Sequence, residues 1–386
     1  MEERQFLMLP GPTPVPPKVL QALARPMINH RGSEFKGLLD EAAEGLKEVF
    51  CTSQEVLILT SAGTGAMEAA VSNFVSPGEK VLVVSIGSFG DRFAQIAQQF
   101  GARVDKLDFT WGTAADPAAL AERLRADVNG EIKAVFVTHN ETSTGVTNDI
   151  PALRAAVGGH PALFIVDAVS SLGAMPLETD NWNLDVVVAG SQKSFMIPPG
   201  LSFVCVSPRA WEVAAKCTNA RFYWDLDKAR KMAAKGQTPF TPAIPQVAAL
   251  VESLRMIRAE GLPGIFARHR RLREMTRSGV RAIGLDLLAA DTAASAAVTA
   301  VLAPAGLEAN TLRKVLRDRF NVVVAGGQGK LDNKIFRIGH LGYVHELEII
   351  AVLAALEMSL TLCGHQVELG RAAQAAQTAV LAALNT

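Results

Sequence analysis

The chain contains 386 residues, of which 49% are hydrophobic, so it can bury a large core and does not have the composition of a disordered protein. Its length predicts two domains. Lysine and arginine together number 38, as do aspartate and glutamate, and the formal net charge of zero argues against electrostatic attraction to nucleic acid or to an anionic membrane.

The first twenty residues predict an extended arm. The stretch LPGPTPVPPK, residues 9–18, is rich in proline and cannot form a regular helix before Pro17, because proline lacks an N–H donor and clashes with the preceding turn. We expect residues 1–20 to form this arm and residues 19–24 to lie in the first helix.

From residue 55 to residue 207, short apolar segments alternate with segments of helical periodicity. The apolar segments predict strands at residues 55–60, 80–85, 103–109, 133–139, 162–169, 185–191 and 201–207. The intervening segments predict helices at residues 65–74, 90–100, 116–126 and 150–159. This alternation is typical of a mostly parallel sheet with helices on both faces.

A long helical stretch, residues 246–283, separates this pattern from a second one. A smaller α+β domain is predicted by the segments at residues 296–304, 310–320, 321–327, 334–342 and 345–360. With the boundary placed near residue 260, the prediction is an α/β protein. It has a large domain at residues 21–260 and a small C-terminal domain at residues 261–386.

The four cysteines include no CxxC pair, so neither a zinc site nor a dithiol motif is indicated. They predict buried thiols in a reducing compartment. The N-terminus has no basic-then-apolar signal region, and no apolar run is long enough to span a bilayer. We therefore expect a cytoplasmic protein that binds neither nucleic acid nor a membrane.

Lys193 lies between two apolar runs, residues 186–189 and 201–206, that predict buried strands. An ammonium group at the edge of an apolar sheet is partly desolvated, which lowers its pKa and frees the amine as a nucleophile. Such an amine forms a Schiff base with an aldehyde, and pyridoxal phosphate is the common aldehyde cofactor. Considered alone, Lys193 is more typical of an exposed loop lysine, so this interpretation needs an acidic partner and a phosphate site.

Asp167 is the candidate acidic partner. It stands at the carboxyl end of a predicted apolar strand, which is where ligands bind in open α/β sheets. A carboxylate there would keep a pyridine nitrogen protonated, so that the ring accepts electrons. An aspartate that caps the turn after its strand is the alternative.

The segment LILTSAGTGAMEAAV, residues 57–71, is the candidate phosphate site. A strand ends at Thr60, a glycine-containing turn follows, and a helix begins near Gly65. Free N–H groups and the dipole at a helix N-terminus suit a phosphate, and Ser61 and Thr64 add hydroxyl donors. The alternative is an ordinary turn with a Ser/Thr cap.

Arg337, in the short apolar segment IFRIGHLG, is the fourth candidate. A buried guanidinium is costly unless it is paired. It can bind a substrate carboxylate through two parallel hydrogen bonds, and a structural salt bridge is the alternative.

Five motifs follow one another along the chain: TSAGTGAMEAA, HNETSTGV, IVDAVSSLG, GSQK and RIGHLG. Together with MLPGPTPVPP near the N-terminus, they resemble the class V aminotransferases of fold type I, specifically the alanine–glyoxylate and serine–glyoxylate aminotransferase group. The resemblance extends from residue 8 to about residue 360, nearly the whole chain.

The resemblance implies a site for pyridoxal 5′-phosphate. Lys193 would bond the cofactor and later move the Cα proton of the substrate, and Asp167 would pair with the pyridinium. Arg337 would bind the substrate α-carboxylate. The implied cofactor-binding positions are Ser61, Ala62, Gly63, Thr64, Phe89, Thr142, Asp167, Val169, Gln192, Lys193 and Thr241.

Those positions divide between the cofactor phosphate and its ring. Thr64 and Gln192, with backbone amides around Gly63, would hold the phosphate. Thr241 would reach the phosphate of the neighbouring subunit.

For the ring, the resemblance implies that Phe89 and Val169 cover its two faces. Thr142 would approach the ring hydroxyl.

The resemblance also implies a reaction. An amino group would pass from alanine or serine to glyoxylate through a Schiff base on Lys193, giving glycine and a 2-keto acid. The partners are then a small amino acid, a 2-oxo acid and a second copy of the chain. Family members are homodimers with the active site at the interface, and LPGPTP and NHRGSEF would border it.

Three alternatives remain open. Phosphoserine aminotransferase would need further basic residues near Arg31. A cysteine desulfurase would need a mobile nucleophilic cysteine late in the chain, and Cys363 is the candidate. A non-catalytic subunit of a larger complex, such as a soluble hydrogenase, is the third.

Overall fold

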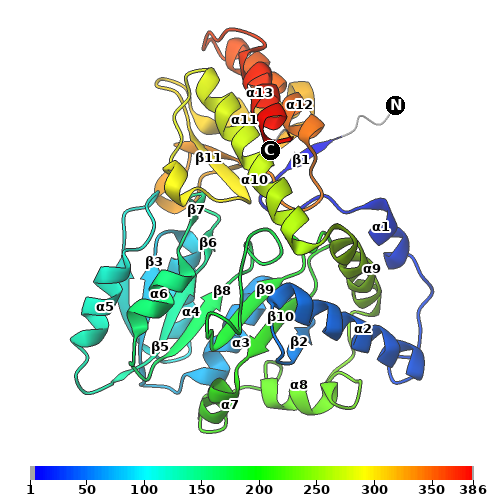
Figure 1. Ribbon diagram of the computed structural model, residues 1–386, viewed down its shortest axis with the longest axis vertical. Coiled ribbons are helices and arrows are strands. Elements are labelled where there is room, and N and C mark those ends of the chain that lie inside the picture. Colours follow the sequence, from blue (N-terminus) through cyan, green and yellow to red (C-terminus); the bar gives the residue numbers. More distant parts are fainter. Residues whose placement is uncertain (1–4, 385–386) are drawn as a thin grey trace.

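The computed structural model describes residues 5–384. Residues 1–4 of the predicted arm and residues 385–386 of the predicted C-terminal domain lie outside this range. The chain forms a large body around a seven-stranded sheet and a smaller body around a four-stranded sheet, one above the other in Figure 1.

The large sheet has the strand order β2-β10-β9-β8-β5-β3-β4. Its strands are β2 (Val56–Leu59), β3 (Lys80–Ser85), β4 (Arg103–Asp108), β5 (Ile132–Thr138), β8 (Leu163–Asp167), β9 (Val186–Gly190) and β10 (Ser202–Val206). All pairs from β9 to β4 are parallel, and β10 is antiparallel to both of its neighbours. The predicted mostly parallel sheet is therefore confirmed.

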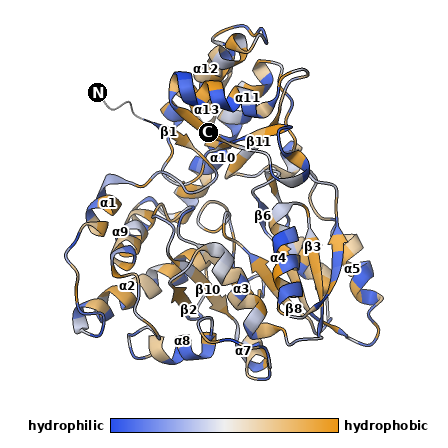
Figure 2. Ribbon diagram, turned by 180° about the vertical axis from the view of Figure 1, so that it is seen from behind, coloured by the Kyte–Doolittle hydropathy of each residue, from blue (hydrophilic) through white to orange (hydrophobic). Residues whose placement is uncertain are grey.

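Helices cover both faces of this sheet. One face carries α1 (Pro17–Leu23), α2 (Ser33–Phe50), α5 (Pro117–Arg125), α6 (Ile150–Val157) and α9 (Ile244–Glu260). The other carries α3 (Gly63–Phe74), α4 (Ser88–Gln99), α7 (Pro208–Ala214) and α8 (Leu226–Ala233). Alternate residues of β9 enter the two cores, Val187 on one face and Val188 on the other. The strands are accordingly hydrophobic, while α5 and α8 carry hydrophilic residues (Figure 2).

The second sheet has the order β1-β12-β13-β11. Its strands are β1 (Phe6–Met8), β11 (Val298–Leu302), β12 (Val322–Gly326) and β13 (Ile335–Gly339). The helices of this body are α10 (Leu262–Ala282), α11 (Ala309–Phe320), α12 (Glu346–Leu362) and α13 (Arg371–Leu384). Because β1 pairs in parallel with β12, the predicted arm begins as an edge strand of the second sheet.

The remaining short elements lie in connections. They are β6 (Asn140–Glu141), β7 (Val146–Thr147) and the 3₁₀ turns η1 (Asp291–Ala293) and η2 (Gly329–Leu331). Among the described helices, none has both the length and the apolar character needed to cross a membrane.

Two parts of the helical prediction differ from the structure. The single stretch predicted at residues 246–283 is two helices, α9 and α10, separated by Gly261. The φ of Gly261 is 75°, in the left-handed region that favours glycine, so the chain changes direction there into the second body. In addition, no element was predicted for residues 33–50, where α2 packs against α9.

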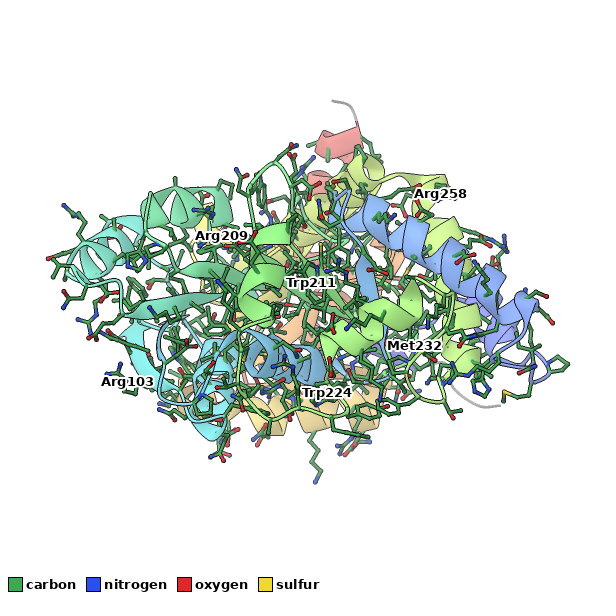
Figure 3. The ribbon with its side chains drawn as sticks, turned by 90° about the horizontal axis from the view of Figure 1, so that it is seen from below. Arg103, Arg209, Trp211, Trp224, Met232 and Arg258 are labelled. Carbon is green, nitrogen blue, oxygen red and sulfur yellow. The ribbon has the colours of Figure 1, made fainter. Side chains whose placement is uncertain are left out.

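The geometry of the sheet decides which end is available for a site. The helix α7 follows β10, which runs antiparallel, so α7 starts at the edge opposite to the carboxyl ends of the parallel strands. Figure 3 shows Trp211 of α7 and Met232 of α8 on this underside. The carboxyl ends of the parallel strands therefore face the second body (Figure 1).

Candidate active site

Most of the predicted site residues lie at the carboxyl ends of the parallel strands, the edge of the large sheet that faces the second body. Asp167 is the last residue of β8, and Lys193 follows β9, its parallel neighbour. The segment with Thr142 follows β5, which pairs with β8 on the other side. The helix α3 starts there after β2, because β2 runs in the same direction as β9 across the antiparallel β10.

Lys193 is only 8% exposed and is covered by the N-terminal segment. Its Nζ donates a hydrogen bond to the carbonyl oxygen of Pro10 at 2.5 Å. The Oγ1 of Thr13 donates to the Lys193 carbonyl at 2.9 Å, which fixes the loop from the other side. The φ of Gly11 is 128°, in the region that favours glycine, and a Cβ there would also lie 2.5 Å from the lysine Nζ and displace the amine.

The electrostatic environment of Lys193 favours a neutral amine. Burial first, and then the positive charges of Arg337 and Arg92, lower its pKa to about 8, while Asp167 acts in the opposite direction. Near pH 7, about one unit below this value, roughly a tenth of the amine is therefore neutral and carries a lone pair. An amine in this state can attack a carbonyl carbon or accept a proton.

Asp167 is 3% exposed and accepts few hydrogen bonds for a buried carboxylate. Its Oδ1 accepts from the backbone N–H of Val169 at 2.9 Å, and its Oδ2 accepts from Thr138 Oγ1 at 3.4 Å. Burial raises its pKa to about 6. Asp167 does cap the turn after its strand, but the cap leaves its charge largely uncompensated, so a cationic ring nitrogen would stabilise it.

The helix α3 has an open N-terminus. It begins at Gly63, two residues earlier than predicted, and its N-cap residue Ala62 supplies no side-chain hydrogen bond. The Oε1 of Gln192 is buried without a hydrogen-bond partner among the described residues. A Cβ at Gly63 would come within 2.8 Å of a Val169 methyl group, so the turn has no room for a larger residue. Free N–H groups beside a glycine turn fit an anionic group such as a phosphate, and of the Gln192 amide only the Nε2 group can donate to such an anion.

The two predicted hydroxyl donors of this turn differ in their contacts. Ser61 Oγ lies 2.5 Å from Ser202 Oγ, so it is engaged by the neighbouring strand. Thr64 Oγ1 accepts a hydrogen bond from Arg92 Nη1 at 3.3 Å.

Thr142 belongs to a small buried network centred on Ser170, a residue that the sequence analysis did not select. Thr142 Oγ1 and Asn140 Nδ2 both donate to Ser170 Oγ, at 2.8 and 2.9 Å. The Ser170 hydroxyl in turn donates to the Asn140 carbonyl at 2.9 Å. This network fixes the side chain of Thr142 beside the turn that follows Asp167.

Arg337 lies in β13 and is 5% exposed. Its Nε donates to the Gly326 carbonyl and its Nη1 to the Thr142 carbonyl, each at 2.8 Å. No carboxylate within residues 5–384 forms an ion pair with Arg337. The described residues therefore do not contain the structural salt bridge that was the alternative. Burial lowers its pKa to about 10, the charge of Glu141 raises it and that of Arg313 lowers it. The two backbone contacts hold the guanidinium in place while its charge remains available to an anion.

Glu141 is a buried acid that the sequence analysis did not identify. It is fully buried at the start of α4, where its Oε2 accepts from the N–H groups of Phe89 and Gly90 at 3.0 and 3.2 Å. Its Oε1 accepts from the N–H and hydroxyl groups of Ser143. The acid therefore caps α4 and holds Phe89 in position. Glu141 is the only charged residue in the polar segment NETSTG, residues 140–145, and this isolated charge was the sequence signal that could have identified it.

Thr241 is the one predicted residue that stays apart from the others. It is exposed, between α8 and α9, and shares a small surface pocket with Leu59, Thr60 and Trp224. The resemblance places its contact in a neighbouring subunit, so its role stays a prediction.

The sheet, the buried lysine at its carboxyl edge and the open helix N-terminus beside that lysine define a pyridoxal-phosphate-dependent transferase of fold type I. Residues 5–332 match the family described as Aminotransferase class-V, and the chain belongs to this family. Pyridoxal phosphate is its cofactor, and the predicted fold and enzyme class are confirmed.

Similar proteins carry several names. The chain is 48% identical, over 95% of its length and 96% of the relative's, to the "Soluble hydrogenase 42 kDa subunit" of Anabaena cylindrica. It is 40% identical, over 97% of its length and 96% of the relative's, to serine–glyoxylate aminotransferase of Methylorubrum extorquens. The crystal structure of pyridoxamine–pyruvate aminotransferase from Mesorhizobium loti superposes with a TM-score of 0.93 at 30% identity, covering 99% of both chains.

Proposed function

We propose that this protein transfers the amino group of a small amino acid, serine or alanine, to glyoxylate, with Lys193 as the residue that bonds the cofactor. The observation that carries the proposal is the buried Lys193 amine, whose pKa is lowered to about 8 next to Asp167 and Arg337. The 40% identity to a serine–glyoxylate aminotransferase over nearly the whole chain supports this choice of substrates.

The cofactor supplies an aldehyde that accepts the amino group and a ring that withdraws electrons from the adjacent carbon. Lys193, in its neutral form, removes the Cα proton of the donor and returns it on the cofactor side. Arg337 holds the α-carboxylate of the donor and later that of the oxo acid, which fixes the Cα–H bond relative to the lysine. The carbonyl of Pro10 accepts from the amine and Thr13 holds the backbone of Lys193, so the N-terminal segment sets the position of the amine.

The remaining residues orient the cofactor. The first N–H groups of α3 at Gly63 and Thr64, with Gln192, take the phosphate, and Ala62 and Ser61 shape the turn. In this proposal Thr241 reaches the phosphate of the partner subunit in a homodimer.

The ring contacts come from other segments. Phe89 and Val169 cover the two faces of the ring, Thr142 meets the ring hydroxyl, and Asp167 keeps the ring nitrogen protonated. The four unpaired cysteines agree with a cytoplasmic location, which we propose as well, although only Cys205 is fully buried as predicted and the other three are partly exposed.

A half-reaction titration tests this function. We expect the purified holoenzyme to be yellow because of the absorbance band of the bound cofactor. This band should disappear when serine or alanine is added, because the aldehyde is consumed. Glyoxylate, added next, restores the band, and glycine accumulates in equal amount. A band that responds to neither amino acid, or that glyoxylate fails to restore, contradicts the proposed substrates. The rates of bleaching with a panel of amino acids identify the preferred donor.

Replacement of Arg337 tests the carboxylate contact. For Arg337→Ala, we expect the KM values for the amino donor and for glyoxylate to rise together by about ten- to a hundredfold, because one charge-assisted contact serves both acids. Arg337→Lys keeps the charge but not the planar fork, so its KM values should fall between those of Ala and wild type. A rise confined to one substrate would show that separate residues bind the two acids.

The structure gives the cysteine desulfurase alternative no support. Cys363 ends α12 and packs against the core of the second body, and burial raises the pKa of its thiol. A nucleophilic thiolate needs the opposite shift in its pKa.

The phosphoserine aminotransferase alternative depends on cations that could bind the substrate phosphate. Arg31 is the relevant cation, and in this chain it donates to Gln237 Oε1 and to the Thr238 carbonyl. Phosphoserine should therefore be included among the amino acids whose rates of bleaching are compared.

A subunit role in a larger complex is the second candidate, because the relative at 48% identity is named as a soluble hydrogenase subunit. Groups of three or more histidine, cysteine, aspartate or glutamate side chains placed to hold a metal are absent from residues 5–384. The two candidates differ in a simple result. A colourless protein that remains inactive with added pyridoxal phosphate, serine and glyoxylate would favour the subunit role.

A further inference from the structure

Arg92 is a cation in the site for which no role has yet been assigned. It lies in the first turn and a half of α4, three residues after Phe89. Its guanidinium stacks over the Phe89 ring at 4.7 Å, and its Nη1 donates to Thr64 Oγ1 at 3.3 Å. Arg92 therefore bridges the helix that carries the ring-stacking residue and the open N-terminus of α3.

The charge of Arg92 has no nearby counter-ion within residues 5–384. No carboxylate there forms an ion pair with it. The acid next to it in sequence, Asp91, is occupied: Lys106 Nζ lies 2.7 Å from its Oδ1, and Ser85 Oγ donates to the same oxygen at 2.6 Å. Arg92 is thus a guanidinium directed at the α3 N-terminus with its donors largely available.

Arg92 also acts electrostatically on the reacting residues. Its charge opposes the rise that burial causes in the pKa of Asp167, and it adds to the lowering of the pKa of Lys193. Arg92 and Arg337, together with Lys193 when it is protonated, form an excess of positive charge over the buried acids Asp167 and Glu141, because burial raises the pKa of both acids. A further anion would compensate this excess, and the helix N-terminus favours the same sign of charge.

We propose that Arg92 binds the phosphate of the cofactor, as a charged ligand in addition to the backbone N–H groups of α3 and the side chains of Thr64 and Gln192. This inference rests on the proposed cofactor site and adds a residue to it. The guanidinium keeps its stack on Phe89 and turns its free N–H donors from Thr64 to the phosphate oxygens. One residue then couples phosphate binding to the position of the ring-stacking side chain.

Comparison of pyridoxal phosphate with pyridoxal, which lacks the phosphate, separates this role from stacking. Apoenzyme of wild type, Arg92→Gln and Arg92→Lys would be titrated with each aldehyde, with binding followed by absorbance. We expect Arg92→Gln to weaken pyridoxal phosphate by about ten- to a hundredfold and pyridoxal by less than about threefold, because only the phosphate loses a charge-assisted contact. Arg92→Lys keeps the cation and should recover most of the affinity.

Arg103→Gln is the matched control. Arg103 is an exposed arginine at the start of β4, on the edge strand of the same sheet and toward the margin of the view in Figure 3. Its Nε donates to the Gly78 carbonyl at 2.8 Å, and we expect its replacement to leave both affinities unchanged.

Each outcome has a definite meaning. Equal losses for pyridoxal phosphate and pyridoxal in Arg92→Gln, with an unchanged melting temperature, overturn the inference and leave Arg92 as a support for Phe89. If Arg92→Gln fails to fold, Arg92→Lys decides, since wild-type affinity for both aldehydes supports a cationic ligand and equal losses refute it. A wild type that binds neither aldehyde would overturn the proposed site itself, which is a separate result.

Discussion

Lys193→Ala is expected to abolish transamination, with a loss of about 10⁴-fold or more, because in the proposed function Lys193 is both the amine that bonds the cofactor and the base that transfers the proton. The protein should remain folded. The ammonium is 8% exposed and its partner is the neutral carbonyl of Pro10, so its removal breaks no ion pair. The burial that lowers its pKa indicates that the charged form is disfavoured in the folded state. Turnover is measured as glycine formed from glyoxylate, and folding as the melting temperature.

Two further measurements make this prediction specific to Lys193. Lys133→Ala removes an exposed lysine of β5 whose Nζ donates to the Gly130 carbonyl, and we expect it to leave turnover unchanged. Borohydride reduction of wild-type holoenzyme should add the pyridoxyl mass to the peptide that contains Lys193. Normal turnover of Lys193→Ala, or the added mass on another peptide, would refute the assignment.

Asp167→Asn is expected to reduce kcat by about 10²- to 10³-fold, because a neutral amide no longer stabilises the protonated ring nitrogen as charge develops. The amide keeps the shape of the side chain and one acceptor for the Val169 N–H. Asp185→Asn is the matched control. Asp185 is another buried aspartate, in contact with Arg209 and placed just before β9 at the opposite edge of the sheet, so we expect its replacement to leave kcat within about twofold.

The pH dependence of stability distinguishes a functional from a structural Asp167. Burial raises its pKa from 3.8 to about 6, so between these pH values the folded apoprotein binds a proton that the unfolded chain has released. Above about pH 6 the ionised carboxylate therefore destabilises the folded state, on the order of 3 kcal/mol, and this effect is lost as the pH falls toward 3.8. Apoprotein with Asp167→Asn should melt higher than wild type at pH 7.5, by an amount that shrinks below pH 6. A lower melting temperature at pH 7.5 would indicate that the aspartate serves mainly as a turn cap.

Much of the fold could be predicted because its information is local. The strand at residues 80–85 was predicted with the bounds that the structure has, and every predicted strand of the large sheet corresponds to an observed one. Alternation of apolar and polar residues depends on neighbours a few positions apart. The helix α2 was missed although its local signal is present, since its buried residues Phe35, Leu39, Ala42, Leu46 and Val49 recur at helical spacing and face α9.

The site was predicted to a different extent for each residue. Lys193, Asp167 and the α3 turn could be selected because each stands at the end of an apolar strand, a position visible in the sequence. Glu141, Ser170 and Arg92 were missed, since their importance comes from what they contact. Glu141 accepts hydrogen bonds from residues 51 and 52 positions away, and Arg92 reaches Thr64, which is 28 positions away. No local pattern specifies such pairs.

The sequence by itself determined the class of fold and the family, and it selected Lys193, Asp167 and Arg337 as candidate reactive groups, because periodicity and the order of motifs can be read without knowing the path of the chain. Only the tertiary structure decided the electrostatics. The carbonyl of Pro10 meets Lys193 Nζ across 183 positions, and Arg337 comes from the second sheet to lie near both Lys193 and Glu141. A pKa depends on burial and on charges within a few ångströms, and those distances exist only once the two sheets have packed together.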